Sequence, residues 1–305
     1  MTATTLDKPV KAPAFQKLSL RRKLVNNVAT VLVTLSVLIA VVPLLWVLYT
    51  VVVKGITSIT SSTWWFNSQA GMTAFQAGGG AYHAIIGTLL QGLVCAIISI
   101  PVGVFVGIYL VEYGGGTRLG KITTFMVDIL TGVPSIVAAL FIYALWVATL
   151  GFQRSGFAVS LALVLLMIPV IVRSTEEMLR IVPMDLREAS YALGVPKWRT
   201  ISSIVIPTAL SGIVTGILLA LARVMGETAP LLILVGYAQA INFDMFNGFM
   251  GSLPGMMYDQ TSAGAGANPV PTDRLWGAAL TLIVLIALLN VGARFIAKFF
   301  APKNF

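Results

Sequence analysis

Charged residues are scarce in this chain. Asp, Glu, Lys and Arg make up 10% of its 305 residues, whereas 57% are hydrophobic. A soluble domain carries roughly a quarter charged residues, so this composition excludes an ordinary globular protein. We therefore expect an integral membrane protein.

Cysteine and histidine are almost absent. The single Cys95 lies inside an apolar run and cannot form an internal disulfide, and the single His83 stands at the start of such a run. We find no nucleophile paired with a base and no cluster of metal-ligand residues. The sequence therefore predicts no catalytic residue, no metal site and no cofactor bound by this chain.

One stretch imitates a nucleotide-binding loop. Residues 115–121 have the G-x-x-x-x-G-K spacing, but Ile122 follows where a Ser or Thr would hold magnesium. The stretch also joins two apolar runs instead of following a buried strand. We interpret it as a glycine-rich turn, and we expect ATP and magnesium to be bound by a separate subunit.

Long apolar runs, by contrast, are abundant. A helix that crosses a bilayer needs about twenty predominantly apolar residues. Six runs qualify and predict an all-α membrane domain over 28–300, with tails at 1–27 and 301–305. The runs lie at 28–53, 83–111, 122–149, 156–173, 207–236 and 276–299.

The basic residues are distributed unevenly between alternate loops. Lys and Arg gather near both termini and in the loop 174–206, while the opposite loops hold only Lys54, Arg154 and Arg274. Cytoplasmic loops of membrane proteins carry the excess of Lys and Arg. We therefore predict a multi-pass protein of the cell membrane with both termini and the loop 174–206 in the cytoplasm. The net charge of +9 then reflects topology and not nucleic-acid binding.

Two features inside the apolar runs concern helix packing and continuity. Gly103 and Gly107 have the G-x-x-x-G spacing that lets helices approach closely, and we favour packing within one chain over a dimer seam.

Around Pro134, polar Thr131 and Ser135 flank a predicted break in the third run. A broken helix there could line a pathway, although a kinked structural helix would have the same sequence.

The polar stretch 187–207 interrupts two apolar runs. It predicts two short helices joined at a corner, where Gly194 suits a left-handed helix end and Pro196 suits the first turn of the second helix. Such a corner beside a membrane favours a docking surface over a catalytic pocket. An interfacial amphipathic helix without a partner is the alternative.

The same stretch resembles the EAA loop of ABC importer permeases. Glu188-Ala189-Ser190, three residues, Gly194, nine residues and then residues 204–207 (IVIP) follow the family pattern E-A-A-x₃-G-x₉-I-x-L-P, except that Ser190 replaces Ala and Ile206 replaces Leu. The resemblance implies a six-span, MetI-like type I importer fold and a coupling helix that docks on an ATPase. The residues it assigns to coupling are Arg187, Glu188, Ala189, Ser190, Leu193, Gly194 and Pro196.

Ionisable residues inside a membrane are costly and usually face a cavity or a partner. Arg223 and Glu227 lie four residues apart in the fifth run, so a continuous helix would place them on one face. From their spacing alone, they are either an ion pair that locks helices or a site for a charged substrate. Asp128 also falls within a run, and its role is left open.

The surrounding sequence narrows this choice. The stretch 212–232, with residues 187–198 and 130–137, closely resembles the PstA family of permeases in phosphate-specific ABC importers, from about the second to the fifth run. In that family the Arg and Glu of A-R-x-x-G-E-T-A-P are implicated in phosphate passage. The predicted pathway residues are therefore Arg223, Glu227, Thr228, Thr131 and Ser135.

The resemblance also implies partners. These are a PstC-like second permease, a PstB-like ATPase dimer and a PstS-like phosphate-binding protein outside the membrane. The alternatives are an importer for another oxyanion or small polar solute, an ATP-independent transporter, or a membrane scaffold. The outer loops 54–82 and 237–275 either touch an extracytoplasmic partner or serve as connectors.

Overall fold

The computed structural model describes residues 19–300. The predicted tail 301–305 and most of the predicted tail 1–27 lie outside this range. The described chain is helical and contains no β-strand, which confirms the all-α fold. Its helices are α1 Leu20–Ile59, α2 Ser62–Phe66, α3 Tyr82–Ile108, α4 Arg118–Thr131, α5 Ser135–Ile142, α6 Gly156–Ile181, α7 Met184–Ala192, α8 Lys197–Thr200, α9 Ile206–Met225, α10 Ala229–Leu234, α11 Leu253–Ser262 and α12 Pro269–Phe300, with π-helical turns at Tyr109–Tyr113, Tyr143–Thr149 and Ile201–Val205.

Within residues 19–300, five helices are long and apolar enough to cross a membrane. A bent pair, Arg118–Thr131 with Ser135–Thr149, would make a sixth span, and its two halves meet at 107°. Pro134 immediately precedes the second half and cannot continue the first. The five unbroken spans are Leu20–Ile59, Tyr82–Tyr113, Gly156–Ile181, Lys197–Met225 and Pro269–Phe295.

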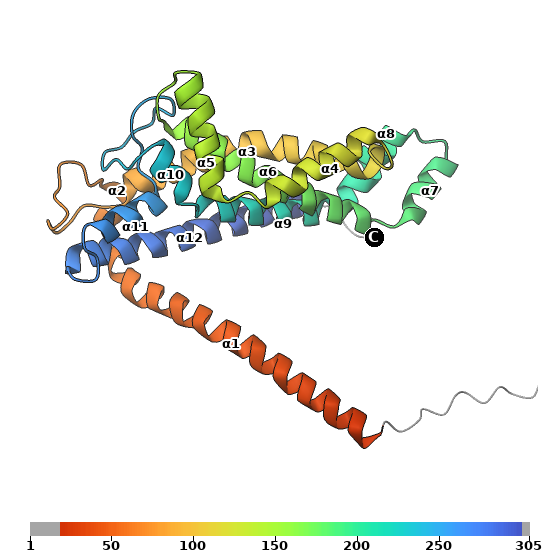
Figure 1. The fold of residues 1–305 in the computed structure, drawn as a ribbon, viewed down its shortest axis with the longest axis horizontal. Helices are drawn as coiled ribbons and strands as arrows, with labels where there is room; N and C mark the ends of the chain where they lie inside the picture. The colour runs from red at the N-terminus through yellow and green to blue at the C-terminus, as the bar shows by residue number, and fades with distance from the viewer. Residues whose placement is uncertain (1–18, 301–305) are drawn as a thin grey trace, which may run out of the picture. The chain divides into compact units, whose positions relative to one another are not determined.

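The chain divides into two compact units. Residues up to Thr50 form the first, which consists of most of α1 in the described range, and residues from Val51 onward form the second. In the second unit, α6 is the central helix and packs against α3, α4, α5, α9 and α10 (Figure 1). Its side chains from Ala158 to Ile171 form much of a buried apolar cluster.

Glycines set the distance between α3 and α6. A Cβ atom added at Gly103 would lie 2.7 Å from Ile171, and one at Gly107 would lie 2.8 Å from Thr175. No real Cβ tolerates such contacts, so only glycine allows the two backbones to come this close. The G-x-x-x-G spacing of α3 therefore packs within the chain.

Two sequence predictions of helix continuity are wrong. The fifth run does not stay helical to residue 236, because α9 ends at Met225 and α10 begins only at Ala229. Pro230 explains the break, since its ring lacks an N–H and would collide with the carbonyl four residues earlier. In addition, the second helix of the corner is not a separate short helix, because Lys197–Met225 is one continuous span.

Candidate functional site

Arg223 lies in the last turn of α9, and its side chain is exposed. Glu227 follows the helix end at Gly226 and is half-buried, with its backbone N–H donating to Val224 O at 3.2 Å. Among the residues that the structure describes, Arg223 has no hydrogen-bond or ion-pair partner. The predicted placement of Arg223 and Glu227 on one helical face is therefore wrong, and they form no ion pair.

Glu227 lines a small cavity between five helices. Thr88, Gln91 and Gly92 of α3 face it, together with residues of α6, α9, α10 and α11. The cavity measures about 10 Å³, enough for roughly one water molecule. The Gln91 side chain is 2% exposed, and its Nε2 has no partner in the described structure. Gln91 was not among the residues predicted from the sequence, although an amide in an apolar run was a usable signal.

The break between α9 and α10 is fixed from several sides. Thr228 occupies the N-cap of α10 and is half-buried. The guanidinium of Arg154, in the loop before α6, donates to Leu232 O at 3.0 Å, while Pro230 and Leu231 are buried. The non-helical backbone beside Glu227 is thus held by packing, as membrane proteins require where a helix is interrupted.

Thr131 and Ser135 flank the other break, between α4 and α5. Thr131 is exposed and donates its hydroxyl to Val127 O at 2.8 Å, within its own helix. Ser135 is half-buried at the start of α5, and α5 packs against α10. The helices that follow the two breaks, α5 and α10, are therefore in contact. No hydrogen bond in the described range joins Thr131 or Ser135 to the residues around Glu227.

The predicted coupling residues separate into two groups. Gly194 has φ +75°, the left-handed conformation expected at the corner. Leu193 is 84% exposed, an unusual environment for a large apolar side chain and one suited to a partner surface. Arg187 and Ser190, by contrast, are buried. The residues that share the exposed face are Glu188, Ala189, Leu193, Gly194 and Pro196.

Arg187 points into the protein. Its guanidinium donates to Val182 O at 2.8 Å, to Leu179 O at 3.0 Å and to the Glu112 carboxylate at 3.0 Å. Glu112 lies in the π-helical turn that ends the α3 span. Glu112 was not predicted from the sequence, since a charge at the end of an apolar run is ordinary at a membrane surface.

Asp128, whose role the sequence left open, is paired. Its carboxylate accepts from Arg173 of α6, and Arg173 also donates to Glu176 at 2.7 Å. Arg180 contacts the same Glu176 at 3.4 Å, and the Glu176 side chain is only 4% exposed. This network ties α4 to α6 and accounts for the charges there without a ligand.

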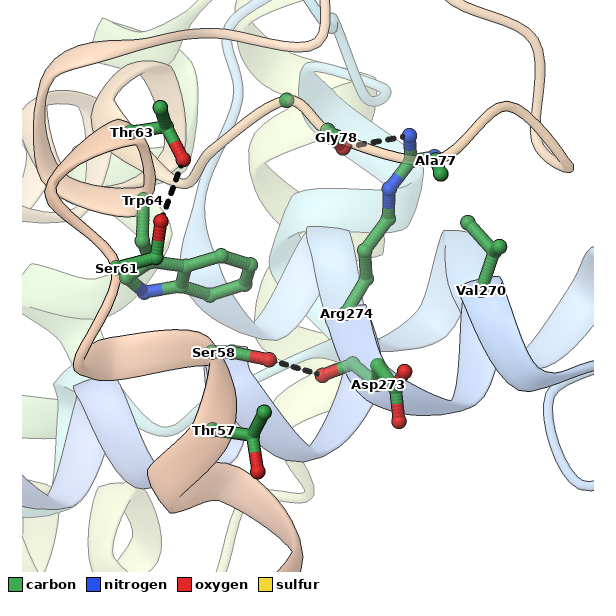
Figure 2. Close-up of a pocket in the computed structure, with 11 residues that line it drawn as sticks. Thr57, Ser58, Ser61, Thr63, Trp64, Ala77, Gly78, Val270, Asp273 and Arg274 are labelled. Carbon is green, nitrogen blue, oxygen red and sulfur yellow. Dashed lines mark hydrogen bonds between the residues drawn. The ribbon is translucent and has the colours of Figure 1, made fainter.

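A larger pocket lies apart from the predicted pathway residues. Its volume is about 230 Å³, and its walls come from the end of α1, the loop after α2 and the start of α12 (Figure 2). Arg274 reaches across to the loop and donates to the carbonyls of Gln76 at 2.7 Å and Gly78 at 3.0 Å. Ser58 donates to Asp273 O at 3.0 Å at the pocket floor. These bonds give the predicted outer loop 54–82 a fixed shape.

The other predicted outer loop, 237–275, also has internal order. Asp244 accepts from the backbone N–H of Phe246 at 2.8 Å and from the Asn247 amide at 2.9 Å, and these bonds lower the pKa of its carboxyl group.

Burial raises the pKa of Tyr237, whose hydroxyl lies 2.8 Å from His83 Nε2. Burial likewise raises the pKa of Asp259. In the part of the chain described, no group of three or more His, Cys, Asp and Glu could hold a metal ion.

Comparison with known proteins places this geometry in a family. Residues 99–305 match the family described as binding-protein-dependent transport system inner membrane component. The phosphate transport system permease protein PstA of Mycobacterium leprae is 56% identical over 307 residues, covering 100% of this chain and 98% of the relative. PstA 1 of Mycobacterium tuberculosis is 54% identical, covering 100% and 97%, and PstA of Pasteurella multocida is 39% identical, covering 93% and 97%.

Solved structures support the fold. The MetNI methionine ABC transporter in inward-facing conformations aligns with a TM-score of 0.55 at 19% identity, over 73% of this chain and 95% of that one. A bacterial alginate ABC transporter aligns with a TM-score of 0.59 at 12% identity, over 93% and 98%. The helical bundle is thus that of a multi-pass ABC importer permease. The chain belongs to the PstA family of phosphate transport system permeases, within the binding-protein-dependent inner membrane components.

Proposed function

We propose that this chain is the membrane permease subunit of an ATP-driven importer of inorganic phosphate and forms half of the translocation pathway. The observation that carries the proposal is the exposed Arg223 at the end of a membrane helix, which has no hydrogen-bond or ion-pair partner among residues 19–295. An isolated charge at such a position is expensive unless it meets a charged ligand. Membership of the PstA family supports phosphate as that ligand.

The neighbouring groups suit phosphate. Arginine presents planar donors that match a tetrahedral oxyanion, and it stays charged when dehydrated. Phosphate near neutral pH still carries a proton, so the Glu227 carboxylate can accept a hydrogen bond from it. Sulfate has no proton to donate and is repelled by Glu227. Thr228, Thr131 and Ser135 supply hydroxyls at the two breaks beside this path.

The partners follow from the exposed corner. We assign Glu188, Ala189 and Leu193 to a docking face for an ATPase dimer, which binds ATP and magnesium and performs the hydrolysis. This chain contributes no catalytic centre of its own. A second permease completes the pathway, and a phosphate-binding protein delivers the substrate from the side opposite the corner. Both termini then lie in the cytoplasm.

The test is phosphate uptake in membranes where this chain, expressed with its partner subunits, is the only importer. Arg223→Gln should abolish uptake while complex yield stays unchanged, because Arg223 has no described partner to lose. Glu227→Gln should retain assembly and admit sulfate as a competitor, since an amide can donate to an unprotonated oxyanion. Glu177→Gln is the matched control, because Glu177 is exposed on α6 away from the two breaks. Full uptake in Arg223→Gln with unchanged selectivity in Glu227→Gln would refute the proposal.

A further inference from the structure

Both arms of the corner contact one turn of the protein. On the α7 side, the Arg187 guanidinium donates to the Glu112 carboxylate, and the side chains of this pair are 8% and 6% exposed. On the α8 side, Lys197 Nζ donates to the backbone carbonyl of Glu112 and lies 4.7 Å from the centre of the Tyr113 ring. The corner is therefore held to residues 112–113 at two points.

The first of these contacts is the more strongly built. The Arg187 guanidinium that binds Glu112 also donates hydrogen bonds to Leu179 O and Val182 O. A buried ion pair is stable only when such additional hydrogen bonds accompany it. Removing one partner leaves the other charge buried and unpaired. Arg187 thus connects the end of α6, the start of α7 and the turn after α3 through one side chain.

Residues 112–113 end a long, continuous helix. The span runs from Tyr82 to Tyr113 without a break. Its other half carries Thr88, Gln91 and Gly92, which line the cavity shared with Glu227. One continuous helix therefore has the corner at its end and the Glu227 cavity along its side.

The packing of α3 favours rigid movement over local bending. Gly103 and Gly107 bring its backbone against Ile171 and Thr175 of α6, with no space for the helices to interpenetrate further. Closely packed helices transmit displacement because their contacts do not deform continuously. A push at Glu112 would accordingly move the wall of the Glu227 cavity.

We propose that the Arg187–Glu112 ion pair and the Lys197 contact to Glu112 and Tyr113 form a brace through which movement of the corner reaches the Glu227 cavity along α3. This inference rests on the proposed import function. Arg187 is then a positioning residue and not part of the docking surface. The ATPase touches the exposed face of α7, and the brace passes the displacement inward.

The test measures phosphate moved per ATP hydrolysed by the complete complex in sealed vesicles. Glu112→Gln retains size and an acceptor for Arg187 but removes the charge, and Lys197→Met removes the second contact from an exposed side chain. We expect each variant to hydrolyse ATP and to lose at least about threefold in the transport ratio, with a larger loss in the double variant. Glu177→Gln, a charge removal on exposed α6 surface, should leave the ratio unchanged.

A second measurement detects the proposed movement beside Glu227 through the reactivity of a cysteine placed there. Thr228→Cys, with Cys95 replaced by Ala, should react with a thiol reagent at different rates with and without ATP. The brace variants should lose this difference while keeping ATP hydrolysis. A purely structural role would lower complex yield and leave both the transport ratio and the ATP-dependent change in labelling intact.

The outcomes separate the two proposals. If the unmodified complex moves no phosphate, the proposed function fails, and the labelling difference alone decides whether the brace exists. If the unmodified complex moves phosphate and Lys197→Met and Glu112→Gln keep both the ratio and the labelling difference, the brace is overturned. If Glu112→Gln does not assemble, Lys197→Met decides, because the Lys197 side chain is exposed.

Discussion

The hydroxyl groups of Ser190 and Thr200 are hydrogen-bonded at 2.8 Å across the corner, and both residues are buried. Ser190 stands at the third position of the E-A-A pattern, where the family pattern has alanine. The substitution therefore adds a direct link between α7 and the base of the α8–α9 span. It links the two arms of the corner from inside and leaves the exposed residues of α7 unchanged.

Replacing this link should have a small, defined effect on stability. Ser190→Ala should lower the unfolding free energy by about 1 kcal/mol, since Thr200 keeps a second acceptor in Pro196 O at 3.4 Å. Adding Thr200→Val should cost little more, because the two hydroxyls then disappear together. Thermal unfolding of the purified complex measures both. Strictly additive losses would show that the two hydroxyls are not coupled.

Gly194 provides a test of the corner geometry. Gly194 has φ +75°, and no atom of a neighbouring residue lies within 4 Å of an added Cβ, so the main cost of a substitution is the strained backbone conformation. The left-handed conformation costs an ordinary L-residue roughly 1–2 kcal/mol, and asparagine tolerates it better. We expect ATP-driven uptake to fall in the order Gly, Asn, Ala, Val, with equal membrane expression checked by immunoblot. A Val variant as active as the Asn variant would contradict the assignment of this corner to coupling.

Much of this architecture could be predicted from the sequence. Apolar run lengths predicted the spanning helices, and Gly194 predicted the left-handed corner, because both depend on local properties of the chain. The C-terminal end of the fifth run was placed wrongly, since its mean hydropathy stays high to residue 236 although the helix breaks before Pro230. The partner of Arg187 was equally inaccessible, because Glu112 lies 75 residues away in sequence and meets it only through the packing of α3 against α6.

Acid should loosen the loop around Asp244. Hydrogen bonds from Asn247 and Phe246 lower the pKa of Asp244 below its ordinary value of 3.8. Their stabilisation is therefore complete above pH 3.8 and is lost as the pH falls through the lowered pKa. Amide hydrogens of Phe246 and Asn247, with exchange corrected for its intrinsic pH dependence, should be less protected at a pH below this lowered pKa than at neutral pH. Asp244→Asn should show weak protection at both pH values, and equal pH sensitivity in that variant would exclude Asp244 as the cause.

Gln91 gives a prediction in which stability and function change in opposite directions. Its buried Nε2 has no partner in the described structure, and an unsatisfied buried donor costs about 1–3 kcal/mol. Gln91→Met should therefore raise the unfolding free energy by about 1 kcal/mol, because it replaces the amide with an apolar side chain of similar size.

The same change should impair transport, because the cavity beside Glu227 loses a polar group able to bind a water molecule. We expect a higher KM for phosphate uptake with nearly unchanged complex yield. Gln91→Glu is the opposing control. Its new carboxylate should repel both the Glu227 carboxylate and the phosphate ion, so stability and uptake should fall together. Thermal unfolding and uptake are measured on the same preparations. A Met variant that loses stability as well as uptake would show that the Gln91 amide serves packing within the bundle and not the passage of phosphate.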